Sequence, residues 1–176
     1  MRSRFRGTRL AVCAVGALTA TTLALSTSPA VAGGTYSGRA YVYGADGFRD
    51  DWNDEGIVST GYNRSSNATC LWQKVLWADR LLDASEIDGI FGPDTKAATA
   101  AWQNLFGLDD DGVAGYLTWT RAGAFLSDSN GDGAVDRYTG RLGRYANLSR
   151  DSDGRYHFYD GDGSARTAGY DYNTCA

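Results

Sequence analysis

The chain has 176 residues and a formal net charge of −4. A net negative chain lacks the basic surface with which proteins bind nucleic acid, so the composition argues against a nucleic-acid partner. His157 is the single histidine. A catalytic zinc site is disfavoured on that ground, because such a site takes three protein ligands that usually include histidines.

The first 32 residues are predicted to be a secretion signal. Four arginines within residues 1–9 precede an apolar stretch over residues 10–25, and Ala30-Val31-Ala32 is a small-residue cleavage site. The stretch is shorter than the roughly 20 residues that span a bilayer, so we expect no membrane association after signal removal. Cleavage after Ala32 removes four of the 17 basic residues and none of the 21 acidic ones, which leaves a net charge near −8.

Residues 33–66 are rich in Gly, Asp, Asn and Tyr and show no helical periodicity. We expect a loop-rich segment that packs on the rest of the protein through Tyr41, Tyr43 or Trp52. The next segment, Cys70 to Leu82, is predicted to be an amphipathic helix. Its core-facing side is formed by Leu71, Trp72, Val75, Leu76 and Leu82. Its other side carries Cys70, Lys74 and Trp77.

A short motif occurs twice after this helix. Residues 88–95 and residues 111–118 both contain Asp-Gly, two apolar or small residues, Gly, two further residues and Thr. Gly permits a tight bend, and Pro93 fits the first turn of a helix, where its missing N–H has no partner to lose. Each copy therefore indicates a loop that opens a helix, and we expect helices over residues 94–106 and 116–126. Trp102 and Trp72 fall on apolar helix faces, which predicts that both are buried.

The composition changes from residue 127 onward, where Gly, Asp, Arg and Tyr dominate. Residues 144–150 and 155–159 flank an Asp-Ser-Asp-Gly sequence, and Asp-Gly between two strand-like runs is a hairpin signal. Residues 160–163 mark a further turn. We expect a small β element in this part of the chain.

The segment after the third helix also resembles a calcium-binding loop of the EF-hand or dockerin type. Asp128, Asn130, Asp132 and Asp136 fall at positions one, three, five and nine. Alternating oxygen ligands suit calcium, but the twelfth position is Thr139 instead of the bidentate Glu. The alternative is an Asp/Asn/Gly turn, and we expect no bound metal and no cofactor.

The two remaining cysteines, Cys70 and Cys175, form an even pair once Cys13 leaves with the signal. In an oxidising compartment a disulfide is the expected state. This bridge would draw the C-terminal segment across the outer side of the first helix, where Tyr170 and Tyr172 could cover Trp77.

Catalytic groups are scarce. A Cys-His pair would require one of the two cysteines to be a free thiolate, which conflicts with the disulfide. A glycosidase needs two carboxylates in different environments, and beyond residue 32 the chain has only two glutamates, Glu55 and Glu86. The acidic stretch 52–55 is the best candidate, but no partner carboxylate can be named. We therefore assign no catalytic residue.

The spacing of these features resembles the bacterial three-helix peptidoglycan-binding domain. The resemblance runs from Thr69 to about Leu126 and rests on Trp72-Gln73, Trp102-Gln103 and the two Asp-Gly loops. It implies that the loops line a groove for peptidoglycan, and the ligand-binding candidates are Tyr116, Arg121, Phe91 and Asp110. Exposed Tyr and Arg suit such a ligand, because sugar faces stack on aromatic rings and stem-peptide carboxylates pair with Arg.

Together these observations predict a mainly α protein. Residues 1–32 are a signal peptide, 33–66 a loop-rich segment, 67–127 a peptidoglycan-binding-like helical core and 128–176 a small β extension. The resemblance implies a secreted, extracellular or cell-wall-associated protein that binds the glycan or stem peptide of peptidoglycan without cleaving it. The alternatives are a small wall hydrolase that uses Asp or Glu, and a secreted inhibitor or interaction protein on the same scaffold.

Overall fold

A computed structural model describes residues 36–175 of the chain, so the predicted signal peptide lies outside the described residues. Three α-helices occur within this range: α1 (Asn67–Ala78), α2 (Pro93–Leu105) and α3 (Tyr116–Gly123). Two 3₁₀ helices, η1 (Phe48–Asn53) and η2 (Ala84–Glu86), precede and follow α1. The strands are β1 (Leu126–Ser127), β2 (Arg137–Thr139), β3 (Tyr145–Arg150), β4 (Tyr156–Tyr159) and β5 (Ala165–Thr167).

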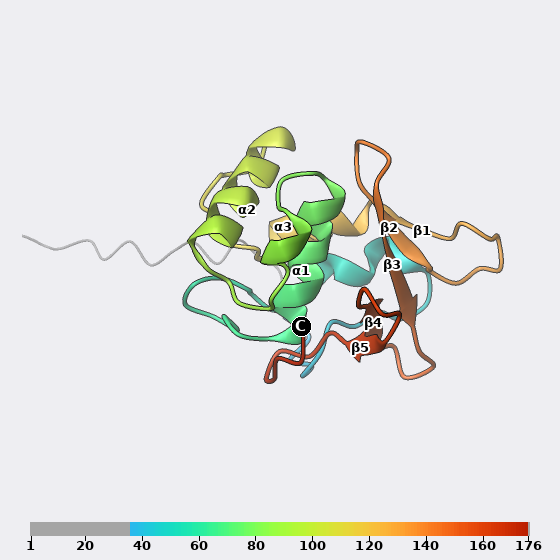
Figure 1. Cartoon of the computed structure of the whole chain (residues 1–176). Coiled ribbons are helices and arrows are strands. Elements are labelled where there is room, and N and C mark those ends of the chain that lie inside the picture. Colours follow the sequence, from blue (N-terminus) through green and yellow to red (C-terminus); the bar gives the residue numbers. More distant parts are fainter. Residues whose placement is uncertain (1–35, 176) are drawn as a thin grey trace, which may run out of the picture. The chain divides into compact units, whose positions relative to one another are not determined.

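The five strands form one antiparallel sheet in chain order, β1-β2-β3-β4-β5, and α1 lies between α2 and this sheet (Figure 1). The prediction of a mainly α fold with a small β extension is therefore wrong, and the described residues form a mixed helix-and-sheet fold. The strands are short and carry few apolar residues, so the alternation of apolar and polar residues along them predicts strands only weakly. In β3, for example, Ala146 and Leu148 are buried while Tyr145 and Asn147 are exposed.

Helix α1 is largely buried, because the sheet packs on the face that was expected to be its outer side. Cys70 on that face is fully buried, and Leu148 and Phe158 of the sheet belong to the same buried cluster. Ser66 caps the helix, since its hydroxyl oxygen accepts a hydrogen bond from the backbone N–H of Thr69 at 3.0 Å.

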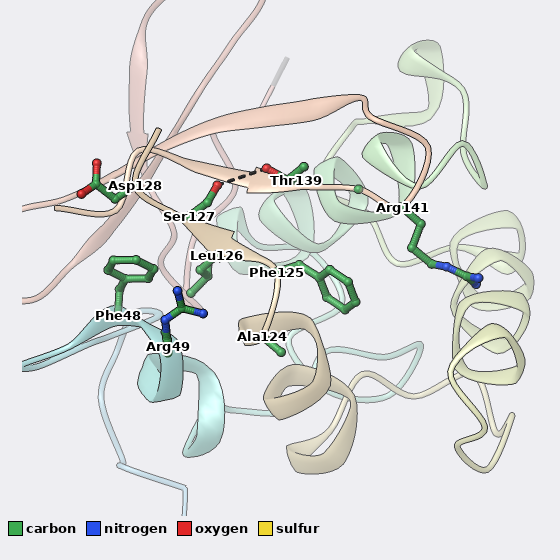
Figure 2. Close-up of a pocket in the computed structure, with 10 residues that line it drawn as sticks. Phe48, Arg49, Ala124, Phe125, Leu126, Ser127, Asp128, Thr139 and Arg141 are labelled. Carbon is green, nitrogen blue, oxygen red and sulfur yellow. Dashed lines mark hydrogen bonds between the residues drawn. The ribbon is translucent and has the colours of Figure 1, made fainter. Parts of the chain in front are cut away.

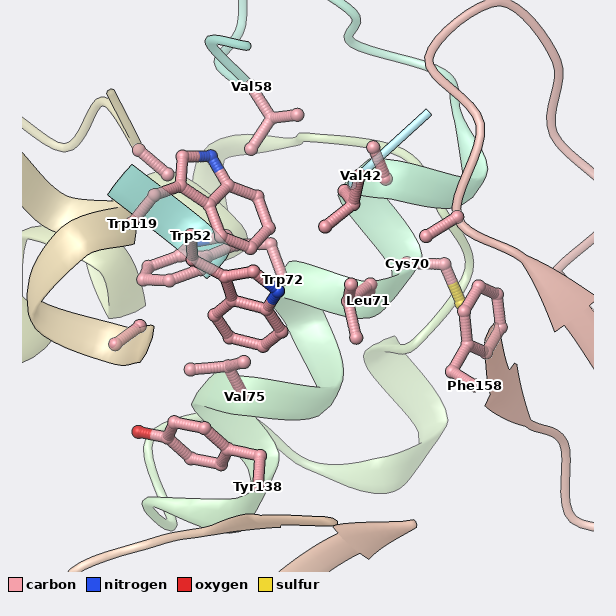
Figure 3. Packing of buried hydrophobic residues seen from close by; sticks show 14 of the residues in the cluster. Val42, Trp52, Val58, Cys70, Leu71, Trp72, Val75, Trp119, Tyr138 and Phe158 are labelled. Atoms are coloured by element: carbon pink, nitrogen blue, oxygen red, sulfur yellow. The ribbon is translucent and has the colours of Figure 1, made fainter. Parts of the chain in front are cut away.

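The core is built around four tryptophans that meet edge to face. The ring centroids of Trp52 and Trp119 are 5.2 Å apart, as are those of Trp72 and Trp119, and Trp72 lies 5.3 Å from Trp102. Figure 3 shows three of these rings beside Val75 and Tyr138. All four indoles have no exposed surface. The predicted burial of Trp72 and Trp102 is confirmed, and Trp52 anchors the N-terminal segment as expected.

The end of the described chain is fastened to the start of α1. Cys70 and Cys175 form the predicted disulfide, with Cα atoms 6.3 Å apart. The expected cover of Trp77 is wrong, however. Arg144 from the β2–β3 connection stacks on the Trp77 ring at 4.6 Å. Tyr170 is instead buried, where its hydroxyl donates to Glu55.

Within residues 36–175, no helix is both long enough and apolar enough to cross a lipid bilayer.

Candidate functional site

The first Asp-Gly loop is held by the side-chain amide of Gln73 in α1. Its Oε1 accepts hydrogen bonds from the backbone N–H groups of Asp88 at 3.1 Å and Gly89 at 2.7 Å. Its Nε2 lies 2.9 Å from Asp88 Oδ1, 3.1 Å from the Ile90 carbonyl oxygen and 3.0 Å from Thr95 Oγ1. Gly89 has a φ of 71°, a left-handed conformation that glycine adopts without strain. One buried amide therefore ties the loop to the helices on either side of it.

The second Asp-Gly loop repeats this arrangement with Gln103 in α2. Gln103 Nε2 donates to Asp111 Oδ1, the Val113 carbonyl oxygen and Thr118 Oγ1 at 2.9–3.0 Å, and its Oε1 accepts from the Gly112 N–H at 2.9 Å. The two aspartates also help to hold the loops, because each accepts a hydrogen bond from a backbone N–H of its own loop. The glutamine amides and the Oδ1 atoms of Asp88 and Asp111 are therefore engaged in holding the two loops.

The four predicted ligand residues do not form one site. Phe91 is fully buried and belongs to the core, which removes it from contact with any ligand. Tyr116 is half-buried at the first position of α3, and Asp110 is exposed in the loop before it. Arg121 is exposed on α3, and its side chain packs on aromatic rings.

Arg121 and Arg141 both pack on the ring of Phe106, although they come from different elements. Their guanidinium carbons lie 4.9 and 5.2 Å from the Phe106 centroid. Arg121 also lies 5.5 Å from the centroid of Phe125, whose ring centroid is 5.1 Å from that of Phe106. We call these four residues the arginine–phenylalanine cluster. The backbone N–H of Arg141 donates to the buried Asp79 at 2.8 Å, which fixes the turn that carries this arginine.

Neither guanidinium of the cluster forms an ion pair with a carboxylate anywhere in residues 36–175. Two like charges beside one ring repel each other, and an external anion would relieve that repulsion. Arginine is well suited to this role, because its planar fork of donors matches a carboxylate and its flat face stacks on aromatic rings. The cluster is therefore a candidate site for a carboxylate or another oxyanion.

A cavity of about 550 Å³ adjoins the cluster and includes Phe125 and Arg141 in its wall. The opposite wall is formed by Phe48 and Arg49 of η1, as Figure 2 shows. Ser127 Oγ and Thr139 Oγ1 lie 3.1 Å apart in its lining and offer hydroxyl groups. The volume is within the range of about 300–1,000 Å³ typical of ligand sites. We call it the first cavity.

The carboxylates of the candidate calcium ligands Asp128 and Asp132 accept hydrogen bonds from the backbone of their own loop. Asp128 accepts hydrogen bonds from the backbone N–H groups of Gly131 at 2.6 Å and Gly133 at 2.8 Å. These hydrogen bonds lower the pKa of Asp128, and the bond from Gly133 has the largest effect. Asp132 likewise accepts from the N–H of Ala134 at 2.8 Å. Within residues 36–175, no group of three His, Cys, Asp or Glu side chains is arranged to hold a metal ion.

Two groups with catalytic potential are also engaged in the structure. The Glu55 carboxyl accepts from the Tyr43 N–H at 2.7 Å and from the Tyr170 hydroxyl at 2.6 Å. Burial raises the pKa of Glu55 to about 8, but the residue is only 3% exposed, so no substrate reaches it. His157 lies between Asp151, at 3.0 Å, and Thr167, at 3.2 Å, and lines neither of the two cavities described here.

Comparison with known proteins gives one family match. Residues 71–121 match the model of a family described as "Putative peptidoglycan binding domain". The predicted resemblance is confirmed for this segment, which is less than a third of the chain and carries both glutamine-held loops. The match supports peptidoglycan binding in general.

One curated relative shares a shorter stretch. The "Uncharacterized protein in bpoA1 3'region" of Kitasatospora aureofaciens is 47% identical over 36 residues. The aligned stretch is 20% of this chain and 30% of the relative, so the chain spans less than a third of that protein's length. No solved structure matches the chain.

Proposed function

We propose that this protein binds peptidoglycan noncovalently and without turnover, and that it contacts stem-peptide carboxylates through the arginine–phenylalanine cluster. The family match over residues 71–121 is the observation that carries the proposal, because it supplies the ligand class. Arg121 lies at the end of that segment, and Arg141 joins it from the sheet. Free carboxylates are a chemical feature of stem peptides, and two guanidinium groups without carboxylate partners complement them.

The local charge supports this assignment. The chain as a whole is acidic, so a ligand with free carboxylates is repelled by most of the molecule. Arg49 and Arg141 line the first cavity and Arg121 belongs to the adjoining cluster, so positive charge exceeds the single negative charge that Asp128 adds to the lining. The carboxylate end of a stem peptide would therefore bind in one orientation, with its charge against the arginines and its methyl groups against Phe106 and Phe125.

Sedimentation with purified, insoluble peptidoglycan tests the proposal. The mature protein should pellet with the polymer, and no soluble muropeptide should appear in the supernatant. Arg121→Ala and Arg141→Ala should each weaken binding about tenfold, which corresponds to one charge-assisted contact of roughly 1.5 kcal/mol. Arg64→Ala is the matched control, because Arg64 is also exposed but belongs to neither the cluster nor a cavity.

Soluble stem peptides separate charge recognition from other contacts. A peptide with free carboxylates should compete for the protein, and the same peptide with amidated carboxyl groups should compete about tenfold less well. Release of muropeptides by a small amount of protein would contradict binding without turnover. Failure of the wild-type protein to pellet would contradict peptidoglycan binding itself.

Secretion and association with the cell wall are part of the same proposal. They rest on the arginine-rich head, the apolar stretch and the small residues at 30–32 of the sequence. Expression in a bacterial host should place the protein in the culture medium or the wall fraction. Amino-terminal sequencing of that protein should begin at Gly33, and retention of the first 32 residues would contradict the proposal.

A further inference from the structure

A second cavity, of about 420 Å³, lies between helix α1 and the sheet and shares no lining residue with the first. Three aromatic residues from three different elements contribute to its lining: Trp77 of α1, Tyr145 of β3 and Tyr159 of β4. Strand β3 contacts both α1 and β4, and Figure 1 shows the three elements. Strands β3 and β4 lie outside the segment that matches the peptidoglycan-binding family, so this cavity depends on a part of the fold beyond that match.

The aromatic rings are held in place by neighbouring side chains. Arg144 stacks on Trp77 at 4.6 Å, and Arg137 stacks on Tyr145 at 4.5 Å. The hydroxyl of Tyr159 donates to Ser149 at 3.0 Å. Even so, Tyr145 remains 47% exposed. Fixed and partly exposed rings offer flat apolar surface with little loss of side-chain entropy on binding.

The polar groups of the cavity balance in charge. Lys74 supplies a cation and Asp160 a carboxylate, and Asn147 adds an amide that both donates and accepts. Burial lowers the pKa of Lys74, while the negative charge of Asp160 works in the opposite direction. Asp160 is further paired with Arg166 at 2.7 Å. The lining residues therefore carry no net formal charge, while Arg144 and Arg137, which stack on two of the aromatic residues, add positive charge beside the cavity.

An occupant that fits these walls has an apolar flat face and a rim of hydroxyl groups. A pyranose ring meets both conditions, because its C–H bonds form a face that stacks on aromatic rings and its hydroxyls both donate and accept. We propose that the second cavity binds an uncharged sugar ring of the glycan strand. This inference rests on the proposed function and deepens it, since the glycan would be bound at the second cavity and the stem carboxylates at the arginine–phenylalanine cluster.

Chitotetraose, an uncharged oligomer of N-acetylglucosamine, is the probe for this site. In a nitrogen–proton correlation spectrum, the indole N–H signal of Trp77 should shift as chitotetraose is added at millimolar concentration. The other four indoles are fully buried in the core and serve as internal controls, so their signals should stay in place. Trp77→Phe assigns the signal.

Variants of exposed lining residues test whether the cavity itself binds the sugar. Tyr145→Ala and Asn147→Ala should each weaken chitotetraose binding about tenfold, and Tyr145→Phe should keep most of it because the ring remains. Tyr62→Ala is the matched control, since Tyr62 is 63% exposed and lines neither cavity. All of these positions are exposed, so the variants are expected to fold.

The outcomes separate this inference from the proposed function. If the wild-type protein pellets with peptidoglycan but chitotetraose leaves Trp77 unshifted, the sugar site is refuted and peptidoglycan binding stands. If chitotetraose shifts Trp77 and the protein does not pellet, the sugar site is supported and peptidoglycan binding fails. A Trp77 shift caused by a sugar-free stem peptide, and not by chitotetraose, would also overturn the inference.

Discussion

Replacement of Gln73 by Ala should destabilise the protein by about 3–5 kcal/mol. The substitution removes the side-chain amide. Its Oε1 accepts a hydrogen bond from the Gly89 N–H at 2.7 Å, and its Nε2 lies within 3.1 Å of three acceptor oxygens. Gly89 is buried, and its N–H has no other partner among the described residues. A buried donor without a partner costs about 1–3 kcal/mol, and the loss of packed side-chain atoms adds about 2 kcal/mol.

Urea unfolding with the disulfide intact, followed by tryptophan fluorescence, measures this loss. Because domains of this kind are stable by roughly 5–15 kcal/mol, the midpoint should fall steeply while the slope stays constant. Gln103→Ala should have a similar effect, since Gln103 holds the second loop in the same way. A loss below about 1 kcal/mol for both variants would refute the reasoning, because water would then replace the amide at little cost.

Gln73→Glu sharpens the test, because it keeps the shape and the acceptor oxygen but removes the donor. At neutral pH its carboxylate would face Asp88 Oδ1 and the Ile90 carbonyl oxygen, so the variant should be at least as unstable as Gln73→Ala. Unfavourable surroundings raise the pKa of the new carboxyl in the folded state. Stability should therefore recover as the pH falls toward 4, and a pH-independent loss would show that donation is unimportant.

Three further predictions follow from buried and paired groups. Burial raises the pKa of Glu55 from 4.5 to about 8. As the pH rises from 4.5 to about 8, the free energy of unfolding should therefore fall by on the order of 1 kcal/mol per pH unit, and above about 8 it should level off. Urea titrations of Glu55→Gln should lack this pH dependence. Reduction of the Cys70–Cys175 bridge, which spans 105 residues, should destabilise the protein by roughly 4 kcal/mol, and a thiol assay on unreduced protein that lacks residues 1–32 should find no free thiol. Millimolar calcium should leave the melting temperature unchanged, because Thr139 replaces the twelfth-position carboxylate; a rise that is lost in Asp132→Ala would contradict this.

The starts of the helices were largely predictable because they depend on local chemistry, whereas α1 ends at Ala78 instead of Leu82 and α3 ends at Gly123 instead of Leu126. Pro93 occupies the first turn of α2, and α3 begins at Tyr116, as the Asp-Gly loops indicated. Helix α1 begins three residues earlier than predicted, at Asn67, because Ser66 supplies the cap. The sheet was not predictable to the same degree, since its short strands gain stability from packing on α1 and carry little signal of their own.

The candidate site was only partly accessible from the sequence. Arg121 was identified through its exposure and charge, but Arg141 was missed because it meets Phe106 only through the tertiary fold. The role of Gln73 and Gln103 was also missed. Here a signal existed, because each follows a tryptophan and precedes an Asp-Gly loop, and a residue pair repeated with the loop motif indicates a shared structural role.

The first turn of α1 is completed by residues from the far end of the described chain. The backbone N–H of Asn67 donates to the Tyr172 carbonyl oxygen, and that of Ala68 donates to the Gly169 carbonyl oxygen, both at 2.8 Å. These are two of the N–H groups that a helix cannot satisfy from within. A graft of residues 67–127 onto another protein would therefore carry a frayed helix start, a free thiol at Cys70 and an uncovered apolar face. The helical unit is portable only together with the sheet and the N- and C-terminal segments that pack on it.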